Sequence, residues 1–233
     1  MAIAPLTAVV AIPSKGIQLE GIPMSRVLYV QASPRGGRSH SIAVADAFVD
    51  AYRTSHPDDA IEWIDLFEAE LPSFDGLAVQ AKYTILHGKQ HTQEELEAWK
   101  AVEAIIEQFK SADKYVLAVP MWNFGIPYRL KQWIDLLVQP GYTFSYSPET
   151  GYTGLVTGKP VFIAYARGGE YPEGSEANAM DFQKKYLELA LRFIGLTDIR
   201  SAVVEPTLMG GPDVAAQKQA DAIAKAQAIA KDF

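Results

Sequence analysis

Residues 26–55 read RVLYVQASPRGGRSHSIAVADAFVDAYRTS, and they indicate the fold class most clearly. Arg26–Gln31 is an apolar run of strand length, and apolar residues recur at helical spacing from Ile42 to Tyr52. Between them lies a turn rich in serine and glycine, residues 32–41. A strand that leads through such a turn into an amphipathic helix predicts the first βα unit of an α/β domain.

The same alternation continues to the end of the chain. Further strands are predicted at Ile61–Leu66, Lys114–Pro120, Pro160–Ala166 and Ile199–Val204. Amphipathic helices separate them, one with a capping box of Thr92 and Glu95, and an alanine-rich helix from about Pro212 closes the chain. Five strands alternating with five helices predict a five-stranded parallel sheet with helices on both faces. Two long connections, residues 67–91 and 140–159, are expected to be loops that carry function or partner contacts.

Composition restricts the class of protein. The net charge of −7 argues against a nucleic-acid partner, which normally meets a basic face. The chain has no cysteine, which excludes disulfides, thiolate metal sites and a cysteine nucleophile, and which fits a cytoplasmic location. The four histidines have no metal-binding spacing, and no apolar run is long enough to span a membrane. We expect a poorly ordered extension at residues 1–23 and one domain over residues 24–233.

The turn after the first strand has the composition of an anion site. Ser33, Ser39 and Ser41 supply hydroxyl groups, and Arg35 or Arg38 can add positive charge. The free N–H groups and the dipole of the following helix point at the same place. The alternative is that a serine only caps the helix. The dinucleotide and P-loop fingerprints and a phosphatase cysteine are all missing, so that FMN is the leading candidate for the phosphate ligand.

Two further loops are expected at the same edge of the sheet. After the third strand, residues 120–127 read PMWNFGIP, a mixture of aromatic, apolar and amide side chains that suits a flat ring with polar edges. After the fourth strand, residues 166–169 read ARGG, where paired glycines allow a ligand to approach the backbone. Each loop could also be an ordinary turn. Ligands of such sheets bind outside the carboxyl ends of the strands, which is where all three loops lie.

Taken together, these segments resemble the FMN-dependent NADH-azoreductase family, relatives of the flavodoxin-like quinone reductases. The resemblance covers residues 24–233. It rests on Ser33 with Ser39–Ser41, on PMWNF at 120–124 and on RGG at 167–169. It also includes TFSY at 143–146, GLVTGK at 154–159 and FIGLTD at 193–198. Position 40 is often glutamine in the family and is histidine here, and position 122 is often tyrosine and is tryptophan here.

The resemblance implies a flavodoxin-like fold and a homodimer with FMN at or near its interface. The implied FMN-binding residues are Ser33, Arg35, Ser39, His40, Ser41, Pro120, Met121, Trp122, Asn123, Phe124, Ala166, Arg167, Gly168 and Gly169. Tyr146 and Phe193 match positions that resemble the walls of the family's substrate pocket, although the helical spacing around Phe193 also fits a core residue.

The implied reaction has two steps, in which NADH or NADPH reduces the flavin and a quinone or azo compound then takes the electrons. We expect the flavin N5 to accept the hydride, with no side chain acting chemically and ping-pong kinetics. One alternative is a flavodoxin-type electron carrier, which would have a shorter chain without long aromatic loops. A second is a flavin-free phosphate-ester hydrolase or regulatory binding protein, for which the histidines offer no recognised acid–base arrangement.

Overall fold

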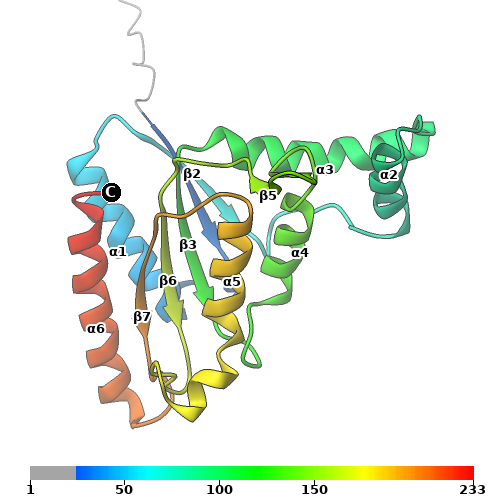
Figure 1. Ribbon diagram of the computed structural model, residues 1–233. Coiled ribbons are helices and arrows are strands. Elements are labelled where there is room, and N and C mark those ends of the chain that lie inside the picture. Colours follow the sequence, from blue (N-terminus) through cyan, green and yellow to red (C-terminus); the bar gives the residue numbers. More distant parts are fainter. Residues whose placement is uncertain (1–24) are drawn as a thin grey trace, which may run out of the picture.

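The computed structural model describes residues 25–233, which form a three-layer α/β fold around one parallel sheet (Figure 1). The sheet has the strand order β2-β1-β3-β6-β7. Its strands are β1 (Arg26–Gln31), β2 (Ala60–Asp65), β3 (Lys114–Pro120), β6 (Val161–Ala166) and β7 (Ile199–Val204). This is the flavodoxin-like order, in which the winding direction switches between β1 and β3. The predicted fold class is confirmed. The expected extension at residues 1–23 lies outside the described residues.

Helices cover both faces of the sheet. One face carries α1 (His40–Ser55) and α6 (Gly211–Ala230), which lie side by side. The other carries α3 (Gln93–Ser111), α4 (Tyr128–Leu137) and α5 (Phe182–Phe193). The predicted capping box at the start of α3 is present, with Thr92 and Glu95 each accepting the other's backbone N–H.

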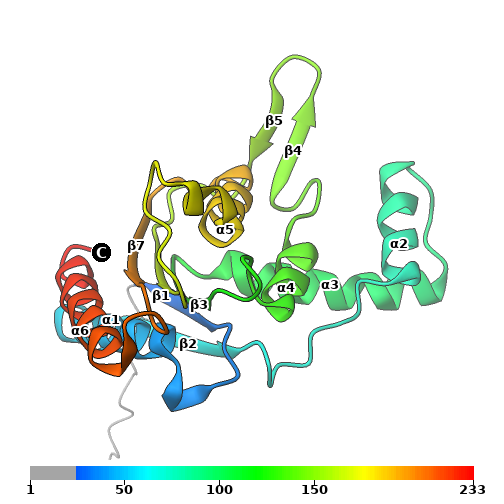
Figure 2. The same ribbon diagram turned by 90° about the horizontal axis from the view of Figure 1, so that it is seen from below.

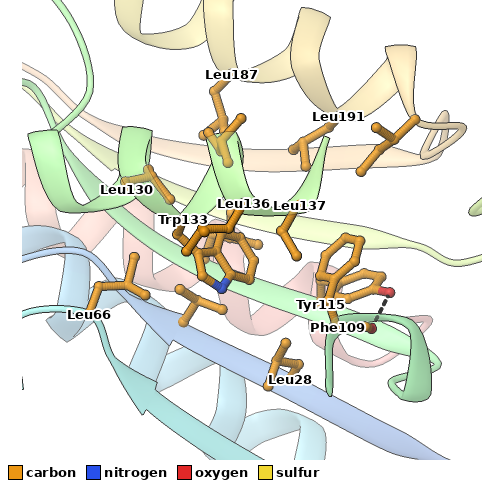
Figure 3. Close-up of a cluster of buried hydrophobic side chains, with 14 of the residues drawn as sticks. Leu28, Leu66, Phe109, Tyr115, Leu130, Trp133, Leu136, Leu137, Leu187 and Leu191 are labelled. Atoms are coloured by element: carbon orange, nitrogen blue, oxygen red, sulfur yellow. Dashed lines mark hydrogen bonds between the residues drawn. The ribbon is translucent and has the colours of Figure 1, made fainter. Parts of the chain in front are cut away.

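Each face of the sheet has its own hydrophobic core. On the α3–α4–α5 side, Trp133 is 1% exposed and packs among leucines from both the sheet and the helices (Figure 3). Tyr115 of β3 stacks on Phe109 of α3 and donates a hydrogen bond of 2.8 Å to its carbonyl oxygen. On the other side, Phe48 of α1 stacks on Phe162 of β6 with ring centroids 4.1 Å apart. Burial on both sides makes the central strands a fixed platform for the loops at their ends.

Two projections lie within the segments that we expected to be loops. Residues 67–91 contain α2 (Gly76–Leu86), which packs beside the start of α3. Residues 140–159 contain an antiparallel hairpin of β4 (Phe144–Ser147) and β5 (Gly151–Gly154). Figure 2 shows α2 and this hairpin extending away from the sheet. The prediction of irregular loops was therefore wrong in both segments.

The amino ends of the strands are held by a polar cluster at the edge of the sheet away from the three loops. Lys114, the first residue of β3, donates hydrogen bonds of 2.8 Å to the Tyr52 hydroxyl and 2.9 Å to the main-chain oxygen of Phe233. The Tyr52 hydroxyl in turn donates to the carboxylate of Asp59. Burial and the neighbouring Asp59 carboxylate raise the pKa of Tyr52 well above its usual range. The cluster joins the start of β3 to α1 and to Phe233, which follows α6.

Candidate functional site

A cavity of about 150 Å³ opens where the three predicted loops meet, at the carboxyl ends of β1, β3 and β6. Strands β3 and β6 are in register up to Pro120 and Ala166, and Met121 donates its N–H to the carbonyl of Ala166 at 2.8 Å. The cavity is lined by Ser33, Arg35, Ser39, His40, Pro120, Met121, Trp122, Ala166, Gly168, Thr207 and Leu208. Nine of the predicted cofactor residues are thus brought together, and Ser41, Asn123, Phe124, Arg167 and Gly169 are outside this lining.

The β1–α1 turn holds the polar end of the cavity. Ser33 is 1% exposed, and its hydroxyl has no hydrogen-bond partner in the structure. Ser39 caps α1 by accepting the N–H of Ile42 at 3.4 Å, and its hydroxyl lies 3.1 Å from that of Ser41. The capping explanation therefore holds for Ser39 but leaves Ser33 without a role. A buried hydroxyl with no partner is uncommon in a folded protein and indicates a ligand atom or water at that position.

Three cationic or imidazole side chains surround this turn. Arg35 lines the cavity and is exposed, and Arg38 is exposed in the short 3₁₀ helix η1 (Gly36–Arg38). His40 begins α1, and its Nδ1 lies 2.5 Å from the Oε1 of Gln219 on α6. The exposed guanidinium groups and the amino end of a 16-residue helix create a positive local field in a chain of negative net charge.

The loop after β3 is a tight turn with strained backbone. Trp122 and Gly125 exchange two N–H···O hydrogen bonds of 2.9 Å, which encloses Asn123 and Phe124 as the two central residues. Their φ angles are 47° and 70°, the pair of positive values that a type I′ turn requires. Asparagine tolerates this region, but a phenylalanine there costs about 1–3 kcal/mol and persists only where the surroundings impose it. Such strain is typical of a ligand-binding loop.

Arg167 points its side chain away from the cavity into a buried polar cluster. The guanidinium lies 2.9 Å from Asp181 Oδ2 and 3.2 Å from Glu205 Oε2, and its Nε donates to Gln183 Oε1 at 2.9 Å. Arg167 and Asp181 are 3% and 2% exposed. Asp181 also caps α5 by accepting the N–H groups of Gln183 and Lys184. Arg167 therefore ties the start of the Gly168–Gly169 turn to α5, and its side chain lines a separate cavity of about 480 Å³.

The turn after β7 contributes two residues that our sequence reasoning did not include. Thr207 and Leu208 donate their N–H groups to the carbonyls of Arg167 and Gly168 at 2.8 and 3.1 Å, and both line the cavity. A Cβ atom added to Gly168 would come within 2.9 Å of the end of the Leu208 side chain, which would have to move aside. Only the topology could have identified Thr207 and Leu208 as site residues, because β7 is parallel to β6 and ends at the same edge of the sheet.

Tyr146 and Phe193, the two predicted pocket walls, lie in one aromatic cluster on the hairpin and α5. Tyr152 joins them, with ring centroids 5.0 Å from Tyr146 and 5.4 Å from Phe193. Phe193 is half-buried against the α3–α4–α5 core, so it has the core contact that its helical spacing indicates. Neither residue lines the 150 Å³ cavity.

Over residues 25–233, no group of three or more histidine, aspartate or glutamate side chains is placed to hold a metal ion. Within that range, no helix combines the length and the apolar character needed to cross a membrane.

Comparison with known proteins gives consistent matches along nearly the whole chain. Residues 25–230 match the model of a family described as having a flavodoxin-like fold. The chain is 56% identical over 210 residues to an FMN-dependent NADH:quinone oxidoreductase of Nitratidesulfovibrio vulgaris, covering 90% of this chain and 100% of that protein. It also matches an azoreductase structure from Bacillus anthracis with a TM-score of 0.83 and 33% identity, covering 90% of this chain and 100% of the other. A second structure from that organism, an FMN-dependent NADH-azoreductase in complex with FMN, matches with a TM-score of 0.77 and 28% identity, covering 89% and 100%.

Proposed function

Because this chain belongs to the flavodoxin-like family that includes FMN-dependent NADH:quinone oxidoreductases, we propose that it catalyses the same reaction and also reduces azo compounds. NADH is the electron donor and a quinone or an azo compound is the acceptor. The observation that carries the proposal is the 150 Å³ cavity, with an unpaired buried hydroxyl at one end and an aromatic turn at the other.

The polar end of the cavity fits the phosphate of FMN. The unpaired Ser33 hydroxyl donates to a phosphate oxygen, and Ser39 and Ser41 stand at the amino end of α1, where backbone N–H groups favour an anion. Arg35 adds charge from the rim and His40 adds a ring nitrogen. Without a ligand, the buried Ser33 hydroxyl has no compensation for its lost hydration, which is the physical reason to place a ligand atom there.

The aromatic end fits the flavin ring. Met121 and Trp122 line the cavity and would pack against the ring, and the neighbouring turn of Asn123 and Phe124 would present backbone N–H groups to its polar edge. Gly168 lines the cavity, and the main-chain N–H groups of Gly168 and Gly169 would meet the pyrimidine edge; Arg167 on one side and the Thr207–Leu208 turn on the other hold this segment in place. Donors at this edge stabilise the negative charge that reduction places there.

When bound, FMN supplies the group that accepts hydride from NADH and passes electrons to the acceptor. The protein orients the two substrates in turn on one exposed face of the ring, and no side chain of the cavity acts as a nucleophile. Because the two substrates share one face, NAD⁺ leaves before the acceptor binds. Double-reciprocal plots of initial rate against NADH concentration, measured at several acceptor concentrations, should therefore give parallel lines. Intersecting lines would contradict this order of events.

An enzyme is favoured over a flavodoxin-type electron carrier. The α2 arm and the β4–β5 hairpin add structure beyond the central fold, and the matched relatives are named as oxidoreductases. NADH oxidation coupled to menadione reduction measures the activity, which a carrier lacks. We infer a cytoplasmic location, since the reaction consumes NADH.

Ser33→Ala tests the phosphate site. The expected loss is about 10- to 100-fold in FMN affinity, which corresponds to a hydrogen bond with a charged group of roughly 1.5–3 kcal/mol. The apoprotein keeps its stability, because the hydroxyl makes no internal hydrogen bond. Ser111→Ala at the end of α3 is the matched control and leaves FMN affinity unchanged. Equal FMN affinity in both variants would refute the placement of the phosphate.

The enzyme acts as a homodimer. A groove of about 310 Å³ between α4 and α5 is lined by Ile134, Asp135, Val138, Tyr186, Leu189, Ala190 and Phe193. Leu189 is 67% exposed, and Tyr146 and Tyr152 of the hairpin are exposed as well. Exposed apolar side chains gathered in this way are typical of a protein–protein interface. Leu189→Glu should give a monomer in sedimentation velocity, whereas the control Ala228→Glu, at an exposed position of α6 on the other face of the sheet, should not; a dimer in the first variant would place the interface elsewhere.

A further inference from the structure

Three aromatic side chains, Phe67, Trp122 and Tyr128, form a cluster beside the 150 Å³ cavity. Trp122 lines the cavity, and its ring centroid lies 5.6 Å from that of Phe67 and 6.3 Å from that of Tyr128. Phe67 and Tyr128 meet edge to face, with centroids 5.7 Å apart and planes at 89°. We call these three residues the aromatic shelf. Because Trp122 belongs to both, the shelf is continuous with the cavity.

The shelf is assembled from segments that follow different strands. Phe67 comes two residues after β2, whereas Trp122 follows β3 and Tyr128 is the first residue of α4. Strand β1 lies between β2 and β3, so the contact of Phe67 with Trp122 passes over the carboxyl end of β1. In sheets of this topology, ligands bind in the crevice outside these strand ends. The shelf therefore lies where a substrate of this fold is expected.

Hydrogen bonds hold the β2 side of the shelf in place. The N–H of Phe67 donates to Asp65 Oδ1 at 2.9 Å. Arg129, the neighbour of Tyr128 in α4, donates from Nε to the carbonyl of Leu66 at 2.6 Å and from Nη2 to the carbonyl of Ala69. The segment after β2 is thus fastened to the first turn of α4. A surface that is already ordered loses little conformational freedom when a ligand binds to it.

The outer ring of the shelf is left largely uncovered. Tyr128 is 65% exposed, whereas Phe67 and Trp122 are half-buried. A ring with this much exposed surface adds little to the hydrophobic core. Tyrosine has an apolar ring with a polar tip, a combination that is enriched at binding surfaces. Flat apolar faces that adjoin a cavity suited to a flat ring fit a second aromatic ring better than they fit a polar chain.

We propose that the aromatic shelf binds the second ring of a two-ring acceptor, so that Tyr128 favours naphthoquinones and azo compounds over single-ring quinones. The inference rests on the proposed function, because the reacting group of the acceptor must lie over the flavin beside Trp122. A benzoquinone then contacts the flavin alone. The fused ring of a naphthoquinone, or the far ring of an azo compound, extends over the shelf. An aromatic contact of this kind strengthens binding about 3- to 10-fold.

The test uses menadione and toluquinone, two methylated quinones that differ only by a fused benzene ring. Tyr128→Leu removes the aromatic ring from the shelf, and Tyr128→Phe keeps it. The matched control is Trp63→Leu, which removes a ring that is 46% exposed on β2 and belongs neither to the cavity lining nor to the shelf. Steady-state rates with NADH give kcat and KM for each acceptor.

Two further measurements do not depend on turnover. Calorimetric titration of the oxidised, FMN-loaded enzyme with menadione, in the absence of NADH, gives the Kd of the acceptor. Sedimentation velocity reports the oligomeric state of each variant.

Tyr128→Leu should raise both KM and Kd for menadione about 3- to 10-fold at unchanged kcat, which is the signature of lost uniform binding. Its kcat/KM for toluquinone should stay within about twofold of the wild-type value, because this acceptor does not reach the shelf. Tyr128→Phe and Trp63→Leu should match the wild type with both acceptors. FMN affinity should be the same in all four proteins.

An equal loss with both acceptors, or no loss with either, would overturn the inference and leave the proposed function standing. A monomeric Tyr128→Leu variant would also overturn it, because the ring would then belong to the subunit interface. A wild-type enzyme that binds FMN but oxidises NADH with neither acceptor would instead refute the proposed function.

Discussion

Replacing Arg167 by alanine should destabilise the whole domain, although the residue belongs to a loop at the edge of the sheet. The substitution leaves the Asp181 carboxylate, 2% exposed and formerly 2.9 Å from the guanidinium, without its counter-charge. It also removes the donor to Gln183. Breaking a buried ion pair by removing one partner costs about 3–5 kcal/mol. That is a large share of the roughly 5–15 kcal/mol that stabilises a typical domain.

The assays are equilibrium unfolding in urea, which gives the free energy of unfolding, and thermal unfolding, which gives Tm, both followed by tryptophan fluorescence. For a domain of this size the expected fall in Tm is about 6–20 °C, from roughly 2–4 °C per kcal/mol. Lys131→Ala is the control, since it removes an exposed ion pair with Asp135, 2.7 Å long and worth about 1 kcal/mol or less. FMN affinity should fall together with stability in Arg167→Ala, because Gly168 and Gly169 lose their anchor. A loss of less than 1 kcal/mol would show that water replaces the guanidinium and would refute the argument.

Three further predictions concern other parts of the structure. Phe124→Gly removes the strain of a φ of 70° and should stabilise the apoprotein by up to about 1 kcal/mol in urea unfolding. The same substitution should lower the affinity for FMN. A loss of stability would contradict the idea that this turn is strained. Gly154→Ala should yield little folded protein, as judged by circular dichroism, because its Cβ would lie 2.3 Å from the backbone nitrogen of Gly195. Burial raises the pKa of Asp46, so its contribution to stability is present at low pH and is lost as pH rises through the raised pKa. Asp46→Asn should therefore be more stable relative to wild type at pH 7 than at pH 4 in urea unfolding, with the Tyr29 hydrogen bond kept by the amide oxygen; the opposite trend would refute the sign.

The sequence predicted the central sheet well because each strand is a strong local signal. Arg26–Gln31, Lys114–Pro120 and Ile199–Val204 are strands with the predicted bounds. The central residues of the first two are buried, and a strand buried on both faces reads as one apolar run. Helix α2 escaped prediction because its buried face consists of Ala78, Ala81 and Thr84, which are too small or too polar to give an apolar period. The β4–β5 hairpin was missed because its strands are only four residues long.

The site was predictable in its loops but not in the directions of its side chains. Ser33, Met121 and Gly168 follow strands that end at one edge, and the topology alone brings them to one cavity. Arg167 sits between residues of that cavity, yet its side chain faces Asp181, which lies 14 positions along the chain. Thr207 enters the cavity only because β7 is the neighbour of β6 in the sheet. Both facts depend on tertiary packing, which a local pattern of residues does not contain.

The cluster of Lys114 with Tyr52 and Phe233 has a consequence for altering this protein in the laboratory. It closes the amino ends of the strands with hydrogen bonds of 2.8 and 2.9 Å, whereas the cavity lies at their carboxyl ends. In β3, the scaffold contacts of Lys114 and the cavity residue Pro120 therefore lie at opposite ends of the strand. Libraries for directed evolution of acceptor preference should diversify the loops at the carboxyl ends, with Arg167 and its partner Asp181 kept, and should leave the amino ends unchanged.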